Sequence, residues 1–165
     1  IVVKKIFQVN NKSHARFDAV SRSYMYFISE EKNPFELNKY YYFKNKLDLK
    51  KMSECTNLLF NYVDFKSFSK SRSDVKTYNC EIFNASWEII DCKLCFKIKA
   101  DRFLRNMVRA IVGTLIEVGI GTISKDDFEE IINKRDRKLA GYSVPAHALF
   151  LKEINYNWDE ILVNG

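Results

Sequence analysis

The feature of this sequence that most constrains its fold is the segment 102–118, in which apolar side chains recur at helical spacing. At about 100° per residue, these side chains fall on one arc of a helix. They are Leu104, Met107, Val108, Ile111 and Leu115. The opposite arc carries Arg102, Arg105 and Arg109, with Asn106 and Gly113. We therefore expect a helix from 102 to about 118, closed by Gly119 and Gly121, with its apolar side on a core.

The three arginines of this predicted helix allow two interpretations. Arginine keeps its charge and offers forked N–H donors that suit phosphate or carboxylate groups. A row of arginines on a buried helix therefore indicates contact with an RNA backbone or with one essential acid. The alternative is a solvated helix face without a ligand.

The rest of the chain mixes strand and helix patterns. Apolar runs predict strands at 1–9, 22–29 and 148–156, a short strand or edge at 40–43, and a hairpin of 82–90 with 94–100 around a turn at 91–93. Asp48 and Ser124 are predicted to cap helices that run through Leu59 and Ile132. Because strict β-α-β alternation is missing, we expect an α+β fold with a mixed, largely antiparallel sheet packed against a few helices.

Length and composition narrow the class of protein. The chain has 165 residues, 47% of them hydrophobic and 29% charged, which is typical of one soluble domain. We place that domain at 1–156 and expect a weakly structured tail at 157–165. The sequence has no apolar run that could cross a bilayer and no signal-like segment, so we expect a cytoplasmic protein without membrane contact.

The cysteines do not predict a metal site. One C-x-x-C pair, Cys92 and Cys95, is present, but a second pair is missing and neither histidine lies at zinc-finger spacing. The pair instead coincides with the predicted hairpin turn. We expect reduced thiols and no metal.

The net charge of +6 favours a polyanionic partner, because each phosphate that Lys or Arg neutralises releases condensed counterions. The serine-rich segment 65–76 shows neither the helical nor the strand spacing of apolar residues. It is predicted to be a mobile basic loop that carries Lys70 and Arg72. The 13 Phe and 9 Tyr suit strands, and they also offer surfaces on which bases can stack. These features are compatible with RNA binding.

Several short motifs follow one another in a fixed order. They are His14-Ala15-Arg16-Phe17, Arg22-Ser23-Tyr24-Met25-Tyr26, Asp64-Phe65, Ser67-Phe68, Phe103-Leu104, Met107-Val108-Arg109, Ile111-Val112-Gly113, Pro145-Ala146 and Leu149-Phe150-Leu151. Each motif alone is weak. As an ordered set over 1–156, they resemble the C-terminal, larger part of the catalytic region in the TruA family of tRNA pseudouridine synthases.

The resemblance implies an isomerase that converts uridine to pseudouridine in the anticodon stem-loop of tRNA, with no metal or organic cofactor. Such an enzyme must flip the base out of the helix before it can reach the glycosidic bond. In the family an aspartate drives cleavage of that bond. The resemblance also implies tRNA as the partner, a homodimer for the full-length protein, and one half of a pseudouridine-synthase-like fold.

The same resemblance assigns site residues. Arg109 matches the arginine that pairs with the catalytic aspartate, Tyr24 the tyrosine that packs on the target base, and Leu149 the apolar residue on the base's other side. Without the resemblance, Tyr24 is equally a strand-face aromatic and Leu149 a core leucine. The residues expected to contact RNA are His14, Arg16, Arg22, Lys70, Arg72, Arg102 and Arg105.

The family's catalytic aspartate lies in a Gly-Arg-Thr-Asp-Ala-Gly segment, and this sequence contains no such segment among its 5 glycines. Since the chain also begins in a strand-like run at Ile1, we expect a piece of a longer enzyme that lacks its N-terminal part. On that interpretation the 165 residues are inactive alone. The alternative function is a noncatalytic RNA-binding or dimerisation module.

Overall fold

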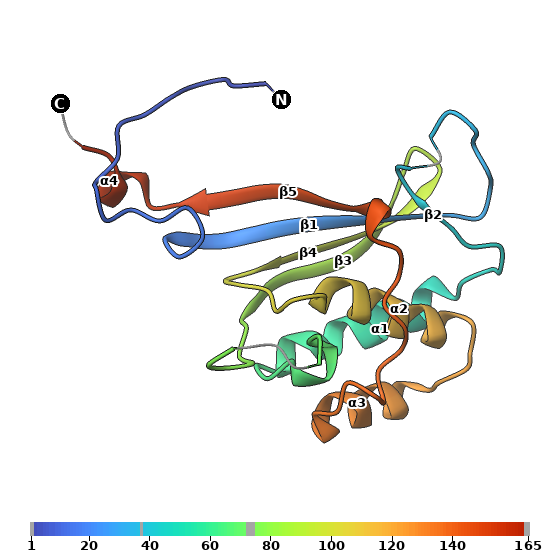
Figure 1. Ribbon diagram of the computed structural model, residues 1–165. Coiled ribbons are helices and arrows are strands. Elements are labelled where there is room, and N and C mark those ends of the chain that lie inside the picture. Colours follow the sequence, from blue (N-terminus) through green and yellow to red (C-terminus); the bar gives the residue numbers. More distant parts are fainter. Residues whose placement is uncertain (1, 37, 72–74, 164–165) are drawn as a thin grey trace.

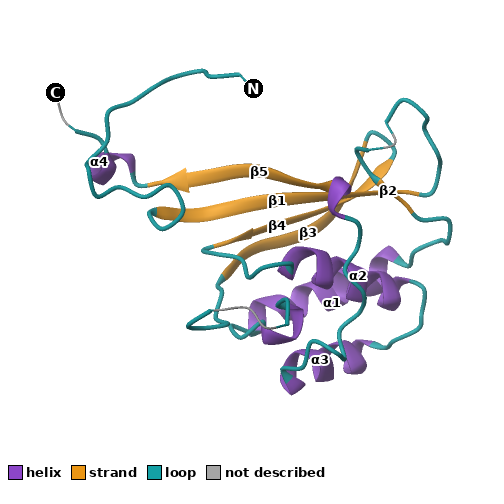
Figure 2. Ribbon diagram, viewed as in Figure 1, coloured by secondary structure: helices purple, strands orange, loops and turns teal. Residues whose placement is uncertain are grey.

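The computed structural model describes the chain except residues 1, 37, 72–74 and 164–165. One sheet and the helices on one of its faces form two main layers (Figures 1 and 2). The strands are β1 (Ala19–Ser29), β2 (Tyr41–Tyr42), β3 (Ile82–Ile90), β4 (Lys93–Ala100) and β5 (Leu149–Tyr156). The α-helices are α1 (Leu49–Leu58), α2 (Met107–Gly119), α3 (Lys125–Lys134) and α4 (Trp158–Ile161).

The long strand β1 organises the sheet. It pairs antiparallel with β4 over Arg22–Ile28 and antiparallel with β5 over Ala19–Tyr26, and it pairs in parallel with β2 at Ile28 and Ser29. The hairpin of β3 and β4 completes the order β2-β1-β4-β3, with β5 also on β1. The predicted α+β fold with a mixed, largely antiparallel sheet is thus confirmed.

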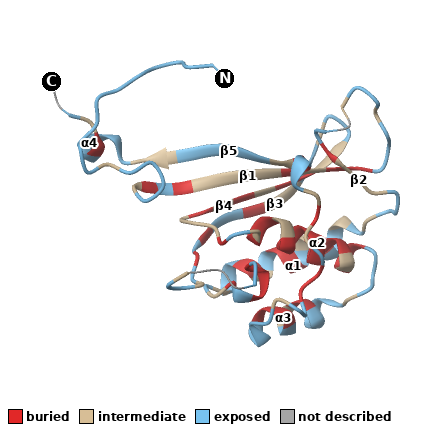
Figure 3. Cartoon of the chain, in the orientation of Figure 1, coloured by how far each residue is buried: buried red, intermediate tan, exposed pale blue. Residues whose placement is uncertain are grey.

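The core lies between the sheet and α1 and α2, while α3 packs farther from the sheet (Figure 1). Figure 3 shows α2 as the most completely buried helix, and the buried set includes both arcs of its surface, from Ala110 and Gly113 to Ile111 and Leu115. Of its residues, Arg109 and Glu117 are partly exposed, and the others are buried around the rest of the helix surface. Its position was predicted correctly from its apolar residues and its closing glycines.

The predicted start of that helix was wrong. The helix begins at Met107, and Asn106 before it takes the left-handed conformation with φ of 72°. The preceding backbone is held by other hydrogen bonds instead: Lys70 N donates to the Arg105 carbonyl at 2.9 Å, and Arg102 N donates to Asp101 Oδ1 at 2.6 Å. Arg102 and Arg105 therefore lie in a loop and do not form a helical row with Arg109.

The other local predictions had mixed outcomes. Asp48 and Ser124 cap α1 and α3 as expected, and Ser124 with Asp127 forms a capping box. The β3–β4 hairpin turns at Asp91 and Cys92, which both have positive φ, as a tight two-residue turn requires.

Two predicted segments differ in the structure. The N-terminal run 1–9 was expected to be a strand, but its described residues form only a bridge between Val9 and Leu162 and are exposed, so no sheet edge captures them. In the predicted basic loop, Phe65 and Phe68 are buried around a short 3-10 helix, Lys66–Phe68. Hydrophobic anchoring of these two rings overrides the polar composition of the segment.

After Asn157, where a weakly structured tail was expected, the chain forms the short helix α4. The backbone of Asn10 donates a hydrogen bond to the Ile161 carbonyl at 3.0 Å, which ties this helix to the N-terminal segment. No helix in the described ranges combines the length and apolar character needed to span a membrane.

Candidate functional site

A surface pocket of about 370 Å³ brings together residues that are far apart in the sequence. It lies where the loop before α2 meets β1 and the start of β5. The lining residues are Arg16, Tyr24, Phe103, Leu104, Arg105, Asn106, Met107, Val108, Arg109 and Leu149. Five predicted site residues, Arg16, Tyr24, Arg105, Arg109 and Leu149, therefore share one pocket.

A close crossing between α2 and the segment 141–145 positions Arg109. A Cβ atom at Gly113 would lie 1.8 Å from the Tyr142 carbonyl oxygen, and one at Gly141 would lie 2.9 Å from the Thr114 backbone. Only glycine allows this approach. It brings Val144 next to the helix, where Arg109 Nε donates to the Val144 carbonyl at 2.5 Å and Val144 N donates back to the Arg109 carbonyl at 3.2 Å.

Tyr24 and Leu149 reach the pocket through the pairing of β1 with β5, in which Tyr26 opposes Leu149. The ring of Tyr24 packs edge-on against Phe103, with 5.1 Å between ring centroids. The Tyr26 hydroxyl donates to the Pro145 carbonyl at 2.9 Å, and burial raises the pKa of Tyr26 well above its usual range. Tyr26 thus stays neutral and anchors the segment that leads into Leu149.

The wall around Asn106 is built from a second hydrogen-bonded group. Asn106 Nδ2 donates to Ser143 Oγ, and Arg137 Nη2 donates to the same oxygen at 2.9 Å. Arg137 Nη1 also donates to the carbonyls of Ala140 and Gly141, at 3.0 Å each. One guanidinium therefore fixes the 140–143 segment and, through Ser143, the Asn106 side chain.

Three predicted RNA-contacting residues, Arg16, His14 and Arg22, make different contacts in and before β1. Arg16 lines the pocket, and its guanidinium carbon is 5.6 Å from the Phe17 ring centroid. His14 packs against the same ring in a tilted arrangement, with 4.3 Å between ring centroids, and does not line the pocket. Arg22 points at backbone oxygens, donating to Ala19 at 2.8 Å, to Asp101 at 2.6 Å and to Arg16. Its contacts are those of a residue that shapes the loop.

The remaining predicted RNA contacts are dispersed. Lys70 lines a neighbouring pocket with Lys66, Arg135 and Arg137, and its backbone is joined to Arg105. Arg102 is half-buried beside Asp101 and does not line the pocket that holds Arg109. Arg72 lies outside the described residues.

Sequence reasoning missed three residues that build the site. Phe103 was noted only as part of a motif, Asn106 only as a neighbour of the arginines, and Ser143 not at all. The polar Asn106 between Arg105 and a mostly apolar helix was the available indication of a helix boundary. Nothing in the local sequence predicted the contact between Ser143 and Asn106, because the two are 37 positions apart.

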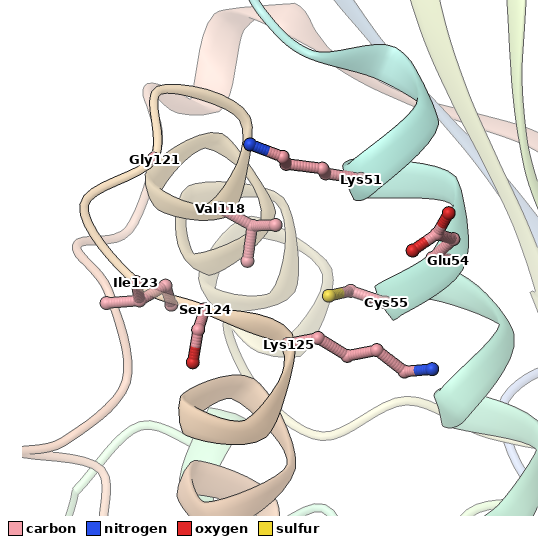
Figure 4. Close-up of a pocket in the computed structure, with 8 residues that line it drawn as sticks. All are labelled: Lys51, Glu54, Cys55, Val118, Gly121, Ile123, Ser124 and Lys125. Atoms are coloured by element: carbon pink, nitrogen blue, oxygen red, sulfur yellow. The ribbon is translucent and has the colours of Figure 1, made fainter.

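A second pocket lies between α1 and α3 and holds none of the predicted site residues. Figure 4 shows Lys51 and Glu54 on α1 and Lys125 on α3 around the thiol of Cys55. Burial raises the pKa of this thiol to about 11, so it is protonated near neutral pH and is a poor nucleophile or metal ligand. This pocket offers no evident chemistry, whereas the pocket beside α2 offers a cation, an aromatic ring and an apolar wall.

Comparison with known proteins gives a consistent family. Residues 62–157 match the family model for tRNA pseudouridine synthase. The chain is 51% identical over 156 residues to tRNA pseudouridine synthase A of Parabacteroides distasonis, covering 94% of this chain and 62% of that protein.

Two further relatives carry the same name. The Bacteroides fragilis protein is 51% identical, and the match covers 94% of this chain and 62% of that protein. The Bacillus subtilis protein is 35% identical, and the match covers 95% of this chain and 64% of that protein. The chain thus spans a little under two thirds of each of these relatives. Since the family model covers more than half of the chain, the chain belongs to the tRNA pseudouridine synthase family.

Proposed function

We propose that these residues form the base-holding part of an isomerase that converts uridine to pseudouridine in the anticodon stem-loop of tRNA. The observation that carries the proposal is the pocket that joins Tyr24, Arg109 and Leu149. These residues come from β1, α2 and the start of β5, and they are the three to which the family resemblance assigns roles at one site. The names of the relatives support the same class of reaction.

Each of the three residues suits a step in handling a flipped base. The Tyr24 ring, fixed by its edge contact with Phe103, offers a face on which uracil can stack. Leu149 supplies an apolar surface on the same pocket. Such a sandwich replaces the stacking that the base loses when it leaves the RNA helix, an energetic cost of a few kcal/mol.

Arg109 is the candidate partner of the reaction's carboxylate. Its Nε is committed to Val144, so its terminal nitrogens are the donors that can face the pocket. An adjacent guanidinium favours the ionised form of a carboxyl group and keeps it nucleophilic when water is excluded. The pocket's lining within the described residues includes no acid, and the Gly-Arg-Thr-Asp-Ala-Gly segment is missing from the sequence. We therefore propose that the aspartate comes from outside these 165 residues.

The charge around the pocket suits an RNA ligand. Arg16 and Arg105 line it, and Lys66 and Lys70 line the neighbouring pocket. Together with the net charge of +6, they can hold the phosphates on either side of a flipped nucleotide. We further propose, from the family resemblance, that the whole protein is a homodimer in the cytoplasm. Light scattering of the whole protein tests its oligomeric state.

Two measurements on the 165-residue chain test the proposal. The chain should bind a tRNA transcript with an affinity that falls as salt rises, and it should produce no pseudouridine in that transcript. Tyr24→Leu should weaken binding, whereas Tyr42→Leu, a matched change on β2 beside Lys32, should not. Absence of salt-dependent binding would refute the RNA role. Turnover above a no-enzyme control would refute an external aspartate.

A further inference from the structure

Asn106 has an unusual backbone and side-chain arrangement for its position. It is the residue before α2, where an Asn side chain commonly accepts a hydrogen bond from the first turn of the helix. Here it makes no such cap, and its φ of 72° is in the left-handed region that non-glycine residues rarely adopt. The side chain is instead turned toward Ser143 and lines the pocket that holds Tyr24 and Arg109.

The hydrogen bond with Ser143 holds the Asn106 side chain in place. Nδ2 donates to Ser143 Oγ, and that oxygen is itself held by Arg137, whose guanidinium also grips the carbonyls of Ala140 and Gly141. Within the described part of the chain, the other end of the amide, Oδ1, accepts no hydrogen bond. The half-buried amide is thus held at the wall of the pocket, with Nδ2 donating to Ser143 and Oδ1 available as an acceptor.

We propose that Asn106 reads the target base, accepting a hydrogen bond at Oδ1 from N3–H of uracil, and that Ser143 and Arg137 are the positioning residues that fix its orientation. This inference rests on the proposed function. Uracil presents a donor at N3, whereas cytosine presents an acceptor there, so a fixed acceptor favours the first and repels the second. Ser143 and Arg137 hold the side chain at the pocket wall, so they determine where this acceptor lies relative to the base edge.

The test compares RNAs that differ at the base edge. The probes are one stem-loop RNA with an all-uridine loop, the same stem with an all-cytidine loop, and the same stem with an all-N3-methyluridine loop. The 165-residue chain should bind the uridine loop about three- to tenfold more tightly than either other loop, as the gain or loss of one hydrogen bond requires. Equal affinity for all three would overturn the inference while leaving RNA binding intact.

Variants separate base reading from a purely structural role. Asn106→Gly removes the amide but tolerates the positive φ, and it should reduce the preference for uridine to near unity. Ser143→Ala and Arg137→Lys keep the amide but remove hydrogen bonds that hold it. They should therefore lower the ratio of uridine-loop affinity to cytidine-loop affinity, while the affinity for the cytidine loop changes less. A structural defect would weaken the binding of all three RNAs by the same factor. That result would refute the positioning role.

Matched controls lie on nearby surfaces. Asn133→Gly changes an exposed asparagine in the last turn of α3 whose amide contacts Tyr62, and Arg135→Lys changes an arginine that pairs with Asp64. Both should retain the uridine preference. If either abolished it, the preference would not arise from the Asn106 amide. If the unmodified chain bound none of the probes, the proposed RNA function would fail together with this inference.

Discussion

Gly113 of α2 lies so close to Tyr142 that a Cβ atom at Gly113 would be 1.8 Å from the Tyr142 carbonyl oxygen. The contact is with backbone, so no change of side-chain conformation can relieve it. The same crossing sets the distance between Arg109 and Val144. Packing of one glycine therefore determines the position of the site's arginine.

Gly113→Ala should destabilise the fold and disturb the pocket. Forcing a methyl group into this crossing should lower the free energy of unfolding by about 1–3 kcal/mol, measured by urea denaturation. It should also weaken binding to stem-loop RNA, because segment 142–145 must move. Gly121→Ala is the control, since Gly121 has φ of 80° but open space around it. That variant should lose about 1–2 kcal/mol from backbone strain and keep its RNA affinity.

Arg109→Lys should lower stability although it keeps the charge. Lysine lacks the Nε donor, so the Val144 carbonyl loses its side-chain hydrogen bond, at a cost of about 1 kcal/mol. The shift of the urea midpoint measures this loss. Arg105→Lys, in the same pocket but with no side-chain bond to backbone within the described residues, should stay within about 0.5 kcal/mol of the parent. Equal effects of the two changes would contradict the role assigned to the Nε bond.

The cysteines should differ sharply in reactivity. Cys92 is exposed in the β3–β4 turn, whereas Cys55, Cys80 and Cys95 are buried, and burial raises the pKa of their thiols to about 11, 12 and 11 respectively. Iodoacetamide near pH 8 should therefore alkylate Cys92 alone in the native chain, as mass spectrometry would show. Cys92→Ser should leave the native chain unlabelled until denaturant is added. Rapid labelling of Cys95 in the native state would contradict the packing of β4.

Asp127 should make stability fall in acid. Hydrogen bonds from Ser124, first from its backbone N–H and then from its hydroxyl, lower the pKa of Asp127 below its ordinary value of 3.8. A lowered pKa in the folded state stabilises the fold above the unfolded-state pKa. That contribution is lost as pH falls through the folded-state pKa.

The pH dependence can be isolated by substitution. The difference in unfolding free energy between the parent chain and Asp127→Asn should be constant near neutral pH and should shrink below about pH 4. Ser124→Ala, which removes the hydroxyl from the capping box, should reduce that acid-dependent part. A difference that grows on acidification would contradict a lowered pKa of Asp127 in the folded state.

The sequence predicted the elements whose determinants are local. Ser124 and Asp48 cap helices through their own neighbours, and the Asp91-Cys92 turn is specified by the backbone conformation of two residues. It failed where distant contacts decide. The loop 102–106 matches the helical period, but a backbone hydrogen bond from the distant Lys70 to Arg105 holds it in another conformation.

The site shows the same division. The resemblance brought Tyr24, Arg109 and Leu149 into one site, and the pocket contains all three. Their assigned catalytic roles remain predictions. The clamp of Ser143 and Arg137 on Asn106 could not be predicted, because it depends on the crossing at Gly113 and Gly141 that no periodicity expresses.

The pairing of β1 with β5 joins residues 19–26 to residues 149–156. During synthesis, Tyr24 leaves the ribosome long before Leu149, and nearly all of the described domain must be made between them. The pocket therefore closes late, and a chain stalled before β5 would carry one wall of the site without the other. Strand pairings of such long sequence separation form slowly, so the two walls of the pocket come together only after β5 has been made.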